Sequence, residues 1–102
     1  MAADSMKATE VAIAAGSAKN ASYLVDELKD MDRETRLLTM ELVVEIMKSA
    51  TPQGRHLLKL FPNGVVIFTA EIEVARQKHG IKSPVAEAKA DLERQNTKPK
   101  IH

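Results

Sequence analysis

Residues 33–50 constrain the fold most strongly, because they predict a helix that is apolar on most of its circumference. Eight of the eleven residues from 37 to 47 are apolar. The polar residues Glu41, Glu45 and Lys48 follow one another at i, i+4 and i+7, which predicts a single narrow solvent face. A helix of this kind lies in the middle of a core or at a subunit interface. The rest of the chain, or a partner, must therefore cover it.

The remaining sequence predicts short helices around this central one. Two helical segments, residues 7–22 and 22–31, precede it, and the first of them is rich in alanine. Two more begin with Thr-Pro or Ser-Pro, the pattern of an N-cap followed by proline at the first helical position, and they run over 52–61 and 83–95. Asp32 is the expected N-cap of the central helix. We therefore predict an all-α domain, a compact bundle of five to six short helices.

Residues 65–79 fit two structures. As a helix, they place their large apolar side chains on one face. As a strand, they alternate in polarity, and Pro62-Asn63-Gly64 then forms the turn of a β-hairpin in an α+β fold. A lone hairpin is marginally stable, and Gly80 stands where a helical C-cap belongs. We favour the helix and keep the hairpin around Pro62–Gly64 as the alternative.

The predicted core comes from the central helix, from the helix after it and from residues 65–79. We expect Leu42→Ala to lower the free energy of unfolding by about 2 to 5 kcal/mol, as core truncations do. The side chains expected to be largely buried are Leu38, Leu42, Ile46, Leu57, Leu60, Phe61, Phe68 and Ile72.

The 102 residues are one domain's worth of chain, so we expect a single helical domain over residues 1–102. Residues 1–6 and 96–102 lack a helical apolar pattern and are predicted to be mobile tails. No apolar run approaches the roughly 18 residues of a transmembrane helix, so we expect no membrane partner. The N-terminal residues do not resemble a secretory signal, and the sequence has no cysteine. We therefore expect a cytoplasmic protein.

The sequence contains no arrangement of residues typical of catalysis. The three histidines are not spaced as helical zinc ligands, and the glycines form no phosphate-binding loop. The carboxylate pairs Glu41/Glu45 and Glu71/Glu73 have no histidine partners in the sequence pattern. We therefore expect that the protein is not an enzyme and has no catalytic residue, no metal site and no cofactor.

The apolar surplus instead predicts a protein-interaction module, such as an adaptor, a small chaperone or a regulator. The apolar residues of 37–47 and 65–74 exceed what the thin flanking segments can cover, and a twofold dimer is the commonest way to hide such a surface. The partner is expected to be a second copy of the chain or another protein. The predicted interface residues are Val44, Met47, Ile67 and Phe68.

A nucleic-acid-associated regulator is the alternative function. Residues 55–79 propose a helix, a turn and a second helix, but the second helix begins with four apolar residues that cannot read base edges. Binding would then rest on phosphate contacts alone. The side chains predicted to make those contacts are Arg55, Lys59, Arg76, Lys78 and Lys82.

Overall fold

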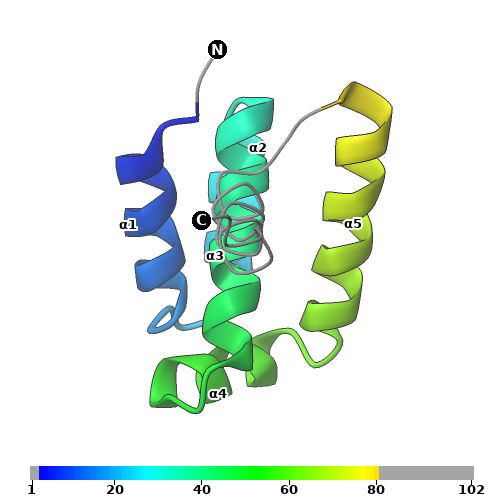
Figure 1. Cartoon of the computed structure of the whole chain (residues 1–102). Coiled ribbons are helices and arrows are strands. Elements are labelled where there is room, and N and C mark those ends of the chain that lie inside the picture. The colour runs from blue at the N-terminus through cyan, green and yellow to red at the C-terminus, as the bar shows by residue number, and fades with distance from the viewer. Residues whose placement is uncertain (1–2, 81–102) are drawn as a thin grey trace, which may run out of the picture.

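The computed structural model describes residues 3–80, and it folds them into five helices gathered around one of them (Figure 1). Within these residues there is no strand, so the predicted all-α bundle is confirmed and the hairpin around Pro62–Gly64 is wrong. The bounds are Ser5–Ala15 for α1, Ser22–Lys29 for α2, Arg33–Lys48 for α3, Pro52–Leu60 for α4 and Gly64–His79 for α5.

The boundaries of the described chain bear on two other predictions. The predicted tail over residues 1–6 overlaps α1, which begins at Ser5 and has Asp4 as its N-cap. The predicted helix over 83–95 and the predicted tail over 96–102 lie outside the described residues.

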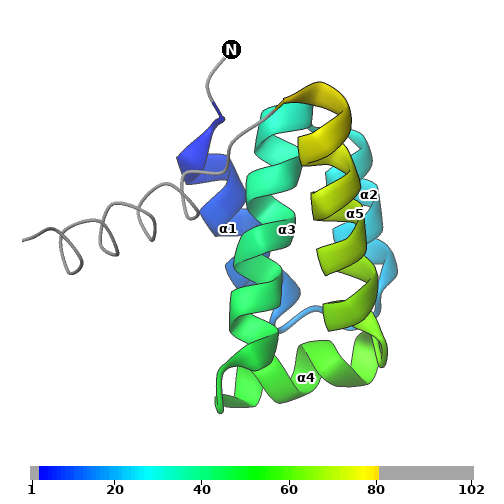
Figure 2. The same cartoon turned by 45° about the vertical axis from the view of Figure 1, so that its right-hand side comes forward.

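The predicted central helix is α3, and every other helix packs against it. In Figures 1 and 2, α1 and α5 flank α3, α2 lies behind it, and α4 crosses below its C-terminal end. The most extensive contacts are those of α1 and α5 with α3. The bundle thus buries α3 from several sides, as its apolar circumference requires.

Caps in the sequence set the ends of these helices. The Asp32 carboxylate accepts a hydrogen bond from the Thr35 amide at 2.8 Å, and it starts α3 where the sequence predicts. The Thr51 hydroxyl accepts from the Gly54 amide at 3.1 Å and starts α4, with Pro52 at the first helical position. Gly80 ends α5 in the left-handed conformation, with φ of 65°.

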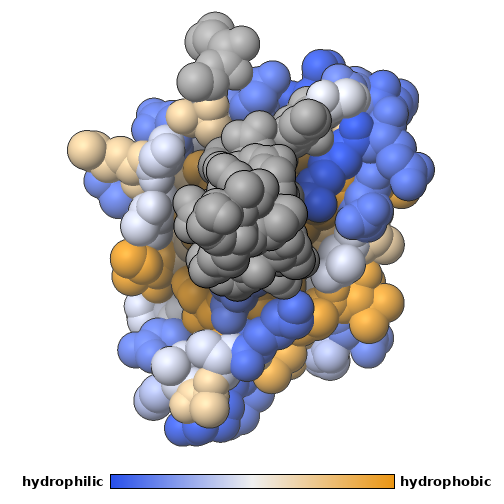
Figure 3. Space-filling model, in the orientation of Figure 1, coloured by the Kyte–Doolittle hydropathy of each residue, from blue (hydrophilic) through white to orange (hydrophobic). Residues whose placement is uncertain are grey.

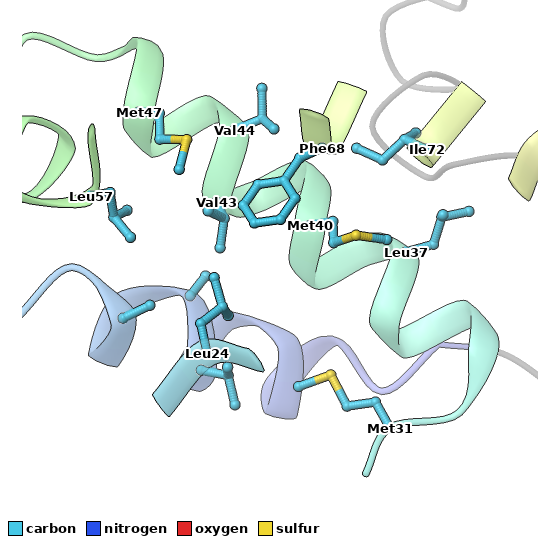
Figure 4. Packing of buried hydrophobic residues seen from close by; sticks show 13 residues of the cluster. Leu24, Met31, Leu37, Met40, Val43, Val44, Met47, Leu57, Phe68 and Ile72 are labelled. Atoms are coloured by element: carbon cyan, nitrogen blue, oxygen red, sulfur yellow. The ribbon is translucent and has the colours of Figure 1, made fainter. Parts of the chain in front are cut away.

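Side chains from every helix meet in one apolar cluster. Phe68 and Ile72 reach in from α5 beside Met40 of α3, and Leu24 lies on the opposite side (Figure 4). The Phe68 ring also lies 5.4 Å from the ring of Phe61, which ends α4. The cluster consists of Val11, Ala12, Ala15, Leu24, Met31, Leu37, Met40, Val43, Val44, Met47, Leu57, Phe68 and Ile72.

The predicted core is right in half of its members. Leu38, Leu57, Phe68 and Ile72 are buried, whereas Leu42, Ile46, Leu60 and Phe61 are only half-buried. The most buried side chains of α3 are Thr39 and Val43, so the helix is turned relative to the prediction. Thr39 can occupy the core because its hydroxyl donates a 2.8 Å hydrogen bond to the carbonyl of Thr35.

The predicted polar face of α3 is wrong at Glu41. Glu45 and Lys48 are exposed, but Glu41 is 6% exposed and lies under α5. There its Oε1 accepts a hydrogen bond from the Arg76 guanidinium at 2.8 Å. A buried carboxylate needs such partners, and Arg76 arrives from a helix 35 residues later in the chain. The local pattern of α3 could not show this contact.

Two adjacent leucines of α4 test which face of this helix packs against the core. Leu57 is fully buried, whereas Leu58 is 37% exposed. We expect Leu57→Ala to lower the free energy of unfolding by about 2 to 5 kcal/mol, because it leaves a cavity in the cluster. Leu58→Ala is the matched control and should cost about 1 kcal/mol or less. Urea denaturation measures both free energies of unfolding, and equal losses in the two variants would show that α4 is turned differently.

Leu42 is half-buried, so Leu42→Ala should lower the free energy of unfolding by less than Leu57→Ala does. Urea denaturation of the two variants measures the difference.

Two carboxylates one turn apart on α3 differ in burial, since Glu41 is buried and Glu45 is exposed. Glu41→Ala removes an acceptor from a charged hydrogen bond and should cost about 1.5 to 3 kcal/mol of unfolding free energy. Glu45→Ala, one turn later and exposed, should change it by about 0.5 kcal/mol or less. Urea denaturation of the two variants provides the comparison. A Glu41→Ala protein as stable as Glu45→Ala would contradict a structural role for the contact with Arg76.

Candidate functional site

A groove of about 590 Å³ lies between α2, the N-terminal half of α3 and the part of α5 from Phe68 to His79. Its apolar lining comes from all three helices. Leu37 and Met40 of α3 and Phe68 of α5 belong to the buried cluster, so the groove opens directly onto the core. The apolar lining residues are Val25, Leu28, Leu37, Met40, Phe68 and Ala75.

The remaining lining residues are charged or titratable, and most of them are cationic. They are Lys29 of α2, Arg33 and Arg36 of α3, and Glu71 and His79 of α5. Three cations therefore line the groove together with a single carboxylate. None of the three forms an ion pair within residues 3–80. The lining of the groove thus combines apolar side chains with an excess of positive over negative charge.

The topology of the bundle explains why these cations gather. Helix α2 ends where Lys29 stands, α3 begins with Arg33, and α5 ends with His79. Because α5 runs antiparallel to α3, its C-terminal end returns to the N-terminal end of α3 (Figure 1). Charged residues at three helix ends, far apart in sequence, thereby line one groove.

Arg36 is held in place by the backbone between α2 and α3. Its Nε donates to the carbonyl of Leu28 at 2.9 Å, and a terminal nitrogen donates to the carbonyl of Met31 at 3.0 Å. These acceptors are neutral, so the guanidinium keeps its net charge. The two bonds fix the turn from α2 to α3 and place a cation at the edge of the groove.

His79 lies where positive charge and partial desolvation both act on it. Desolvation lowers the pKa of its imidazole, and the nearby charges of Arg33 and Lys78 lower it further, while Glu34 opposes them. The ring is therefore largely neutral near pH 7. A negative group that entered the groove would raise the pKa of His79 again.

The predicted interface residues fall into two groups. Val44, Met47 and Phe68 are buried in the chain's own core, whereas Ile67 is 51% exposed on the outer side of α5. Val66 and Val74 are also exposed on α5, and apolar side chains show over the N-terminal half of this helix in Figure 3. Of the four predicted residues, Ile67 alone offers a large exposed surface.

The structure does not bring the predicted phosphate contacts together. Arg55 and Lys59 lie on α4, at the opposite end of the bundle from Lys78 (Figure 1). Arg76 is paired with Glu41 at 2.8 Å and lies 3.7 Å from a Glu73 oxygen. Lys82 lies outside the described residues.

Histidines and carboxylates form no recognisable reactive centre in the described part of the chain. His56 of α4 is half-buried and its Nε2 contacts the carbonyl oxygen of Ala18, which ties α4 to the loop after α1. Over residues 3–80, no three His, Asp or Glu side chains lie close enough together to hold a metal ion. None of the five helices is long and apolar enough to cross a bilayer.

Comparison with known proteins adds no relative: no family model, no curated protein and no solved structure matches the chain.

Sequence reasoning missed the groove because it treated the charges of each helix as separate solvent faces. The signal that could have found it is the position of cations at helix ends. In an up-and-down bundle, the end of one helix lies beside the start of the next, so Lys29 and Arg33 must be neighbours. The contribution of His79 follows only once residues 65–79 are known to be helical.

The environment of His79 predicts how stability depends on pH. Its pKa is lower in the folded chain than the ordinary value of 6.5, so the unfolded chain binds more protons. The contribution of neutral His79 to the free energy of unfolding is present above about pH 6.5, and it is lost as pH falls from there toward the pKa of His79 in the folded chain. The urea midpoint should therefore fall over this window in the wild type, and His79→Gln should reduce the slope.

A second variant separates this effect from simple loss of the side chain. Lys78→Gln keeps the imidazole but removes one of the charges that lower its pKa. We expect an intermediate slope for it. A slope unchanged by both variants would show that another group causes the pH dependence.

Proposed function

We propose that this chain is a protein-interaction module that holds an amphipathic helix of a partner protein in the groove between α2, α3 and α5. The observation that carries the proposal is the groove itself, which has a volume of about 590 Å³ and an apolar lining continuous with the core. An amphipathic helix laid into a hydrophobic groove is a recurrent way in which helical proteins bind peptides. An adaptor, a small chaperone or a regulator could act through such a surface.

The shape of the groove supports this reading. Residues of α2, α3 and α5 line the groove, so a further helix laid there would contact all three and extend the bundle. The apolar lining of the groove includes both buried and exposed side chains. Phe68 is buried and forms a floor, whereas Val25 is 40% exposed and stands in a wall. A partner helix would cover Val25 and pack its apolar side chains over the floor.

The homodimer expected from the sequence remains a prediction. Three of the four predicted interface residues already pack within one chain, so a second copy would contact Ile67 and its exposed neighbours on α5. Light scattering at micromolar concentration measures the mass directly. About twice the 11.2 kDa of one chain would support the dimer.

Two exposed valines test the groove. The probe is a synthetic amphipathic helical peptide with leucine on one face and glutamine on the other. Val25→Gln removes apolar surface from the groove wall and should weaken binding about 5-fold, by loss of about 1 kcal/mol. Val66→Gln is the matched control, because Val66 is 72% exposed but lies outside the groove. Fluorescence anisotropy gives both affinities.

The position of the bound peptide is read from backbone amide shifts in NMR spectra. The proposal expects the largest shifts in α2, in the first half of α3 and in α5 from Phe68 onward. Shifts confined to α1 and α4, or equal effects of the two valine variants, would contradict the proposed site.

A further inference from the structure

We propose that the partner helix of the groove is acidic, with carboxylates flanking its apolar face that meet Lys29, Arg33 and His79. This inference rests on the proposed function and names the chemistry of the partner.

The charges of the groove favour a negative ligand. Lys29, Arg33 and Arg36 line it together with Glu71, and no ion pair within the described residues neutralises the three cations. An apolar helix that covered them without offering carboxylates would desolvate unpaired charge, which is costly. A basic helix would add repulsion of like charges. An acidic helix would instead pair with these cations at the edge of its apolar contact.

The cations also have the placement that an amphipathic helix requires. Arg36 is fixed by two backbone carbonyls, while Lys29 and Arg33 are exposed beside the apolar lining. Charged groups at the rim and apolar groups at the floor match the two faces of one helix. Together they would fix the orientation of the bound helix as well as its affinity.

Three matched peptides test the inference. Each is as long as α5, which has 16 residues, and each has the same leucine face. The polar faces consist of glutamate, glutamine or lysine. We expect the acidic peptide to bind about 10-fold more tightly than the neutral one and the basic peptide to bind most weakly. The advantage of the acidic peptide should shrink as salt rises, because exposed charges are screened.

The outcomes separate this inference from the proposed function. Equal binding of the acidic and neutral peptides, or tightest binding of the basic one, would overturn the acidic partner and leave the groove as a peptide site. Binding of none of the three would overturn both. A short DNA duplex that competes as well as the acidic peptide would overturn the inference in favour of phosphate recognition.

A charge-reversal pair tests which cations are involved. Arg33→Glu should weaken the acidic peptide about 5- to 10-fold and leave the neutral peptide within about 2-fold. The variant should fold, because an acidic residue is favourable in the first turn of α3. Arg55→Glu is the matched control, since Arg55 is exposed on α4 and outside the groove. Equal losses in the two variants would show a diffuse effect of net charge and contradict the inference.

His79 gives an independent readout. Arg33 and Glu34 act on it from α3 and Lys78 from its own helix, and the same groove is lined by Lys29 of α2, Arg36 of α3 and Glu71 of α5. Carboxylates of a bound acidic peptide raise the pKa of His79, so binding takes up a proton and tightens as pH falls from about 8 to about 6. The neutral peptide should show no such trend, and His79→Gln should remove it. An acidic peptide whose affinity does not depend on pH would contradict the assignment of His79.

Discussion

The structure depends on the burial of α3 from several sides. A helix with large apolar residues around most of its circumference is not stable against a single neighbour. The apolar surface that the neighbour leaves uncovered would stay in contact with water, which is unfavourable. Helices α1, α2, α4 and α5 each pack against a part of α3, and together they cover it. The arrangement of the bundle follows from this single requirement.

Local signals in the sequence predicted most of the fold. Asp32, Thr51 and Gly80 mark helix ends in the structure where capping chemistry predicts them. Residues 65–79 form the helix that the sequence favours over the hairpin, and Gly80 ends it. These features depend on interactions within a few residues of chain, which a sequence displays directly.

Features that depend on tertiary contacts could not be predicted in the same way. Glu41 carried the signature of a solvent face, and its burial depends on Arg76 arriving from α5. Thr39 looked polar, yet a hydrogen bond within its own helix lets it occupy the core. The candidate site is of the same kind, because its cations come from three helix ends that are neighbours only in the folded bundle. The sequence shows which residues the site contains, but it does not show that the fold brings them together.

The attachment of α5 has a consequence for the dynamics of the molecule. Among the described helices, α5 makes extensive contact with α3 alone, through Phe68, Ile72 and the Arg76–Glu41 pair. A helix held by one neighbour opens at a lower free-energy cost than the core, so its amides should exchange with solvent by local opening before the global transition. The same helix forms one wall of the groove, so a ligand seated there would bridge α5 to α2 and slow that exchange. Protection of α5 would then report occupancy of the groove without any change of fold.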